Sequence, residues 1–195
     1  MPRLFSIKPS LTYKGRKFKG IRGWAGKPTH PPLTDVPVTC YVLVGLADFV
    51  SWFASNRDGR PGTVARDLFV TGTYLICAGA IVSLPTSLTG FWDWLKSTPK
   101  HSQAWRTANA HMATMVVVTV LVIIDIVMRL NDYAGQTHAE APLMILSVLI
   151  MIVVSFGALL GGTMVYEYAF NVEQNIDYAY ETSETDKLPG TGPLN

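Results

Sequence analysis

The sequence predicts an all-α membrane protein with four transmembrane helices in a bundle and both termini on the cytoplasmic side. Of its 195 residues, 49% are hydrophobic and only 15% are charged, whereas soluble domains carry charge on about a quarter of their residues. The apolar residues gather in four blocks, each near or above the ~20 residues that a helix needs to cross a ~30 Å hydrocarbon core. Because a backbone in lipid must satisfy its own hydrogen bonds, four such blocks indicate four spanning helices.

The blocks run over residues 36–53, 68–92, 112–128 and 142–166. Thr34 or Asp35 is the expected cap of the first helix, with Pro37 in its first turn, as is usual where helices begin. The fourth block contains three glycines that predict a close approach by another helix: Gly157, Gly161 and Gly162.

The distribution of basic residues sets the orientation. Four crossings place both termini on one side, together with 12 of the 16 Lys and Arg residues. The remaining four are expected on the opposite side: Arg57, Arg60, Arg66 and Arg129. By the positive-inside rule the first side is cytoplasmic. Residues 1–27 are basic and lack an apolar core, so no cleavable signal peptide is expected.

Three segments follow from this pattern. Residues 1–32 form a basic cytoplasmic arm, 33–168 the transmembrane domain, and 169–195 an acidic tail that is flexible unless docked. The arm is suited to anionic lipid, which is the default interpretation, or to a partner subunit. Basic residues at membrane boundaries give no indication of nucleic-acid binding.

Two histidines are the main candidates for chemistry, because topology places both at the cytoplasmic level. His30 lies just outside the first helix and His111 opens the third. Facing histidines in a helix bundle can act as axial ligands of a b-type haem. The second ring nitrogen of each then needs a partner, for which Asp93, Asn109 and Glu167 are available. The haem propionates would find positive charge on nearby basic residues: Arg22, Lys27, Lys96, Lys100 and Arg106.

The alternative is that His30 and His111 are ordinary solvated or hydrogen-bonded residues at a membrane interface. His101 is a weaker ligand candidate, and His138 is expected to be solvated on the far side. An iron-sulfur site or a disulfide is excluded for Cys40 and Cys77, since their depths in the membrane differ too much. Both cysteines are therefore expected to serve as small packing residues.

Two aspartates lie inside the first and third spans, Asp48 and Asp125. An intramembrane carboxylate is a functional candidate, so a proton path or an ion site is one interpretation. The structural alternative is that both are neutral or accept hydrogen bonds from a nearby hydroxyl, for which the candidates are Ser51, Thr71 and Tyr74.

Several short motifs together resemble the DUF2231 family of bacterial membrane proteins over about residues 27–170. They are His30-Pro31 followed by Leu33 and Pro37, Asp48, the segment Leu88 to Trp94, His111, Gly161-Gly162 and Val165-Tyr166. Some relatives stand fused to or near Rieske iron-sulfur domains, so the resemblance implies a redox setting. It also implies a bacterial cytoplasmic membrane as the location. The long basic arm departs from the usual pattern and suggests a cytoplasmic partner.

The leading hypothesis is an electron-transfer subunit that holds a b-type haem, or receives a quinone, near the cytoplasmic face. The second is a cofactor-free accessory or assembly subunit, whose arm and tail dock onto a larger respiratory or transport complex. A third is an ion or proton pathway through Asp48 and Asp125. No soluble-enzyme motif is present, so catalysis by this chain alone is not expected.

Overall fold

The computed structural model describes residues 20–21, 28–55, 63–168 and 170. This part of the chain contains four helices: α1 (His30–Ser55), α2 (Thr63–Ser97), α3 (Gln103–Asn131) and α4 (Ala141–Tyr166). Each is long and apolar enough to cross a membrane. The prediction of an all-helical chain with four candidate spans is confirmed for the described residues. Of the predicted segments 1–32 and 169–195, the structure describes only residues 20–21, 28–32 and 170.

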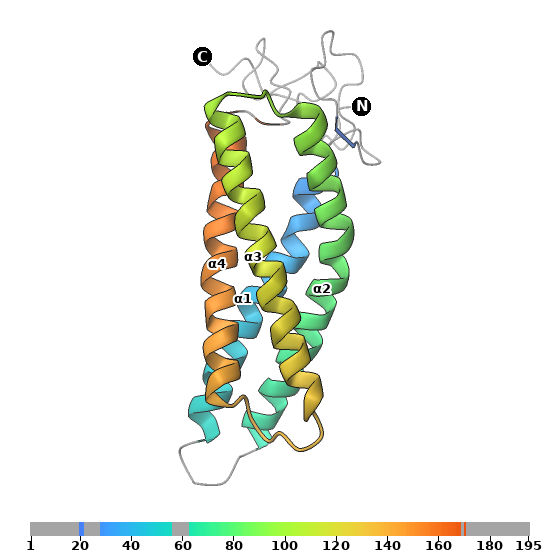
Figure 1. Cartoon of the computed structure of the whole chain (residues 1–195). Coiled ribbons are helices and arrows are strands. Elements are labelled where there is room, and N and C mark those ends of the chain that lie inside the picture. The colour runs from blue at the N-terminus through green and yellow to red at the C-terminus, as the bar shows by residue number, and fades with distance from the viewer. Residues whose placement is uncertain (1–19, 22–27, 56–62, 169, 171–195) are drawn as a thin grey trace, which may run out of the picture.

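The four helices lie side by side, and each runs antiparallel to the one before it (Figure 1). α1 packs against α2 and α4, and α3 packs against α4, whereas α2 and α3 touch only sparsely. His30 and His111 lie at one end of this arrangement, which we call the histidine end. Asp48 and Asp125 lie toward the other, the aspartate end.

The first helix begins earlier than the sequence suggests. α1 begins at His30, so His30 belongs to the helix and does not precede it. The prediction that Thr34 or Asp35 caps the helix is wrong, because the Thr34 hydroxyl donates to the Pro31 carbonyl inside the first turn. Proline is tolerated there, since the first N–H groups of a helix have no intrahelical acceptor.

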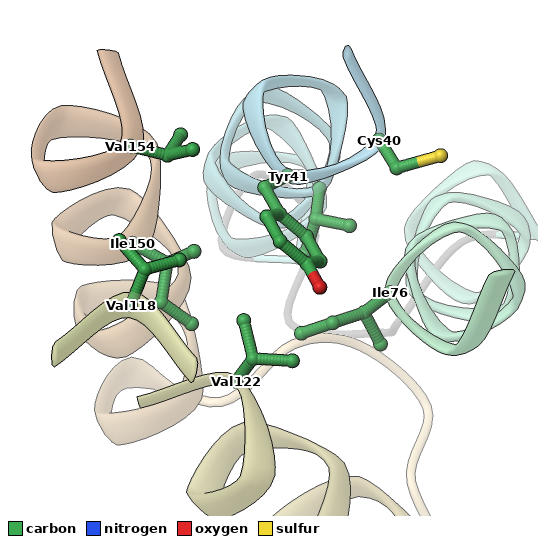
Figure 2. Close-up of a cluster of buried hydrophobic side chains, with 8 residues drawn as sticks. Cys40, Tyr41, Ile76, Val118, Val122, Ile150 and Val154 are labelled. Carbon is green, nitrogen blue, oxygen red and sulfur yellow. The ribbon is translucent and has the colours of Figure 1, made fainter. Parts of the chain in front are cut away.

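An apolar layer from all four helices fills the middle of the structure (Figure 2). Its buried members are Cys40, Tyr41, Val44, Ile76, Val118, Val122, Ile150 and Val154. Cys40 is a free thiol within this layer, and Cys77 is a free thiol that packs against it. The prediction that both cysteines serve in packing is confirmed.

Polar contacts hold the aspartate end together. The Ser51 hydroxyl donates to the Ala65 carbonyl at 2.6 Å and accepts from the Ala139 amide at 3.0 Å. Arg66 donates to the carbonyls of Tyr133, at 2.9 Å, and Gln136. These contacts attach the segment between α3 and α4 to α1 and α2. They therefore fix this segment at the end of the bundle next to the two aspartates.

Candidate cofactor site at the histidine end

His30 is anchored on the neighbouring helix by one ring nitrogen. Its Nδ1 lies 2.9 Å from the carbonyl oxygen of Thr86 in α2. A carbonyl can only accept, so Nδ1 must carry the proton. In the neutral imidazole the lone pair is then on Nε2, the nitrogen that is available to a metal.

His111 repeats this arrangement in the second half of the chain. Its Nδ1 lies 2.9 Å from the carbonyl oxygen of Gly157 in α4, so its Nε2 also carries the lone pair. Both rings are half-buried, and in the described residues neither Nε2 has a hydrogen-bond partner. His30 on α1 and His111 on α3 both lie at the histidine end.

A glycine stands beside each ring, one helical turn beyond the carbonyl that anchors it. A Cβ atom at Gly90 would lie 2.6 Å from His30 Cε1 and 2.9 Å from its Nδ1, which is too close for the ring to stay in place. A Cβ at Gly161 would lie 3.5 Å from His111 Cε1, an ordinary contact. Glycine is therefore required at position 90 for this ring position, whereas position 161 has room for alanine.

Of the carboxyl and amide side chains named from the sequence, Asp93 and Asn109 bind other groups. Asp93 is buried and accepts from the Ile21 amide at 3.1 Å. Asn109 accepts from the Trp94 indole at 2.8 Å, which joins α3 to α2. Glu167 is exposed at the end of α4. The prediction that one of them orients a histidine ring is wrong, since backbone carbonyls of the facing helices do so.

The remaining histidines lie apart from this pair. His101 is exposed and faces the Trp105 ring, with 6.0 Å between ring centroids. His138 lies at the aspartate end, half-buried beside Trp52. Of the basic residues expected here, Arg22 and Lys27 lie outside the described residues. The exposed ones that the structure describes at this end are Lys96, Lys100 and Arg106.

The glycines of α4 serve different contacts. Gly157 faces Met115 and Thr114 of α3, and Gly161 faces His111. Gly162 has only its own helix's Tyr166 within 4 Å. The predicted close approach of a helix is therefore confirmed at Gly157 and does not extend to Gly162.

The intramembrane aspartates share one partner, Arg129. The charge count assigned this residue to the side opposite the termini, and the structure buries it fully in the last turn of α3. Its guanidinium forms an ion pair with Asp125, at 2.5 Å, and another with Asp48 of α1. The hydroxyl partners proposed from sequence do not bond to either carboxylate: Ser51 and Thr71 donate to backbone carbonyls, and Tyr74 is largely exposed.

Comparison with known proteins gives one result. The family model described as a predicted membrane protein, DUF2231, matches residues 26–174. The chain belongs to the DUF2231 family. The match covers the four helices of this DUF2231 protein, both histidines of the pair and the Asp48–Arg129–Asp125 cluster. No curated protein and no solved structure gives a significant match.

Proposed function

We propose that this DUF2231 membrane protein is an electron-transfer subunit that holds a b-type haem between His30 and His111. One observation carries the proposal: both rings donate from Nδ1 to a carbonyl of the facing helix and leave the Nε2 lone pair free. Metal-binding histidines usually have this arrangement, because the second hydrogen bond fixes the tautomer and the ring orientation.

The number of ligands favours haem over a bare metal ion. Protein zinc sites use at least three side-chain ligands, and the described residues contain no group of three or more His, Cys, Asp or Glu that could hold a metal. A haem iron needs only axial ligands from the protein, because the porphyrin supplies the other four. Two oriented histidines are therefore sufficient for haem and insufficient for structural zinc.

The surroundings suit a cofactor with acidic substituents. Exposed Lys96, Lys100 and Arg106 offer positive charge at the same end to the propionates. By the positive-inside rule this end faces the cytoplasm, with both termini on that side. A bound haem supplies one-electron chemistry, and a membrane quinone is a suitable electron partner. The chain's own residues hold and orient the iron and exclude water from the apolar layer beneath it.

The test is titration of the purified protein with ferric haem b in detergent. Wild type is expected to bind one haem per chain with the spectrum of a six-coordinate, low-spin iron, because both axial positions are filled. His30→Ala and His111→Ala each remove one ligand and should lose that spectrum. His101→Ala and His138→Ala are the matched controls and should retain it.

Equal haem binding by all five proteins would overturn the proposal, since it would show that the pair is not the site. Absence of binding by every protein, including wild type, would favour the alternative of a cofactor-free accessory subunit. For that alternative, co-purification of partner proteins should depend on residues 1–27.

The glycine beside His30 gives a finer prediction. Gly90→Ala is expected to weaken haem binding about 10- to 100-fold, the usual effect of disturbing the shell around a metal ligand, because the new Cβ displaces the ring. Gly161→Ala should bind as wild type, since its Cβ meets His111 at ordinary contact distance. The same haem titration measures both affinities. Equal losses of haem affinity in the two variants would show that contact with the His30 ring is not the cause.

A further inference from the structure

The second polar cluster lies where a membrane protein rarely places charge. The side chains of Asp48, Asp125 and Arg129 are fully buried, each with 0% exposure. Arg129 bonds to one oxygen of each carboxylate, and its Nη1 lies 3.4 Å from the Phe69 carbonyl and from Thr73 Oγ1. The guanidinium therefore has partners on α1, α2 and α3.

The charges of this cluster do not balance. Two ionised carboxylates and one guanidinium leave a net charge of −1 out of contact with water. A buried, uncompensated charge is strongly unfavourable, and proteins usually avoid it by neutralising the group. A cation of charge +1 that binds here would cancel the net negative charge.

Two oxygen atoms mark where that ligand would bind. Asp48 Oδ1 and Asp125 Oδ2 are buried and have no hydrogen-bond partner among the described residues. Both carboxylates bind the same guanidinium, so they lie close together. A metal cation such as Ca²⁺ requires six to eight oxygen ligands, and the described residues form no metal-binding group here. A proton requires only one oxygen, so it is the cation that fits.

No other ionisable group at this end is bonded to the cluster in the part of the chain that is described. From α4, the Ser147 hydroxyl lies beside Asp48 and is not ionised. It donates its one proton to the Met144 carbonyl at 3.0 Å, so it leaves Asp48 Oδ1 without a hydrogen bond. Arg66 of α2 faces the neighbouring Phe69 ring and donates to carbonyls of residues 133 and 136. The other titratable side chains near this end are Asp67, Tyr74, Asp132, Tyr133, His138 and Glu140. Residues 56–62 lie outside the described part.

The position of the cluster decides the side from which it exchanges protons. The apolar layer around Val44, Ile76 and Val122 separates it from the histidine end. Asp125 lies six residues before the end of α3 at Asn131, about 9 Å along the helix axis at 1.5 Å per residue. The aspartate end is therefore the nearer route to water.

We propose that Asp48, Asp125 and Arg129 form a binding site for one proton, which exchanges with the aqueous phase at the aspartate end. The proton comes from water and binds to one of the two unpartnered carboxylate oxygens, so that the cluster becomes neutral. An aspartate in the unfolded chain is ionised at neutral pH, so unfolding releases this proton. The folded protein therefore loses stability as rising pH removes the proton from the cluster. The site rests on different residues from the proposed haem site and does not depend on it.

Infrared spectroscopy of the full-length protein tests the proposal. At a pH low enough for the cluster to hold its proton but high enough to ionise exposed carboxyl groups, the wild type should show the C=O stretching band of a protonated carboxyl group. The band should shift in deuterated water and disappear as the pH is raised. Asp48→Asn and Asp125→Asn should each remove this band, because one carboxylate and Arg129 balance without a proton. Asp67→Asn, which changes an exposed carboxylate of α2, is the matched control and should retain it.

The wild-type spectrum is a sufficient test if a variant does not fold. The proton site would be ruled out if the folded wild type shows no such band at any pH, or if both aspartate variants retain the band. A band that disappears when sodium is added at constant pH would show that a metal cation and not a proton is the ligand.

Discussion

Replacing Arg129 with methionine is expected to lower the free energy of unfolding by about 3–5 kcal/mol, the range found when one partner of a buried ion pair is removed. The variant leaves Asp48 and Asp125 buried without the cation that both contact. It also removes the link between α1 and α3 at the aspartate end. Unfolding in mixed micelles of a mild detergent and sodium dodecyl sulfate measures the change.

A combined variant separates charge from packing. Arg129→Met with Asp48→Asn and Asp125→Asn removes all three ionisable groups, so most of the lost stability should return. Uncharged replacements of a buried ionic triad are often neutral. If Arg129→Met alone unfolds at the same detergent fraction as wild type, the cluster does not stabilise the fold and the account of it is wrong.

Gly45→Ala is expected to destabilise the protein by about 1–3 kcal/mol, as is typical when a methyl group is forced into a packed core. The new Cβ would lie 2.7 Å from Met151 Cβ and 3.0 Å from the Ser147 carbonyl oxygen, both on α4. Neither atom is the end of a flexible chain, so α1 and α4 must move apart. The same unfolding experiment in mixed micelles measures the effect.

Gly162→Ala is the matched control for this helix contact. A Cβ at Gly162 would meet only its own helix's Tyr166, at 3.9 Å, so stability should stay the same or rise slightly because alanine favours helix. Equal destabilisation by Gly45→Ala and Gly162→Ala would show that any glycine-to-alanine change in these helices lowers stability. The loss at Gly45 would then not arise from the close approach of α1 to α4.

Hydropathy predicts the four helices of this chain because lipid requires long apolar helices. It does not locate their ends. His30 lies inside α1 since two prolines after it are compatible with a first turn. Arg129 looked like a boundary residue because it follows the third apolar block. Its spacing of four residues from Asp125 was the signal of an intrahelical pair.

The histidine pair could be located from topology, but its anchoring could not. Side-chain identity gives candidate partners such as Asp93 and Asn109, whereas the actual acceptors are backbone carbonyls, which every residue has. Which carbonyl is within reach depends on how the facing helices pack. Gly90 was part of the resemblance motif, yet its contact with the His30 ring follows only from the three-dimensional arrangement.

The decisive measurement for the haem site is the absorption spectrum of the protein purified from the membrane that contains it. A Soret band is expected and, after reduction, the sharp visible bands of a low-spin b-type haem with two histidine ligands. A folded protein with no haem absorption, which also binds no added ferric haem b, would contradict this proposal.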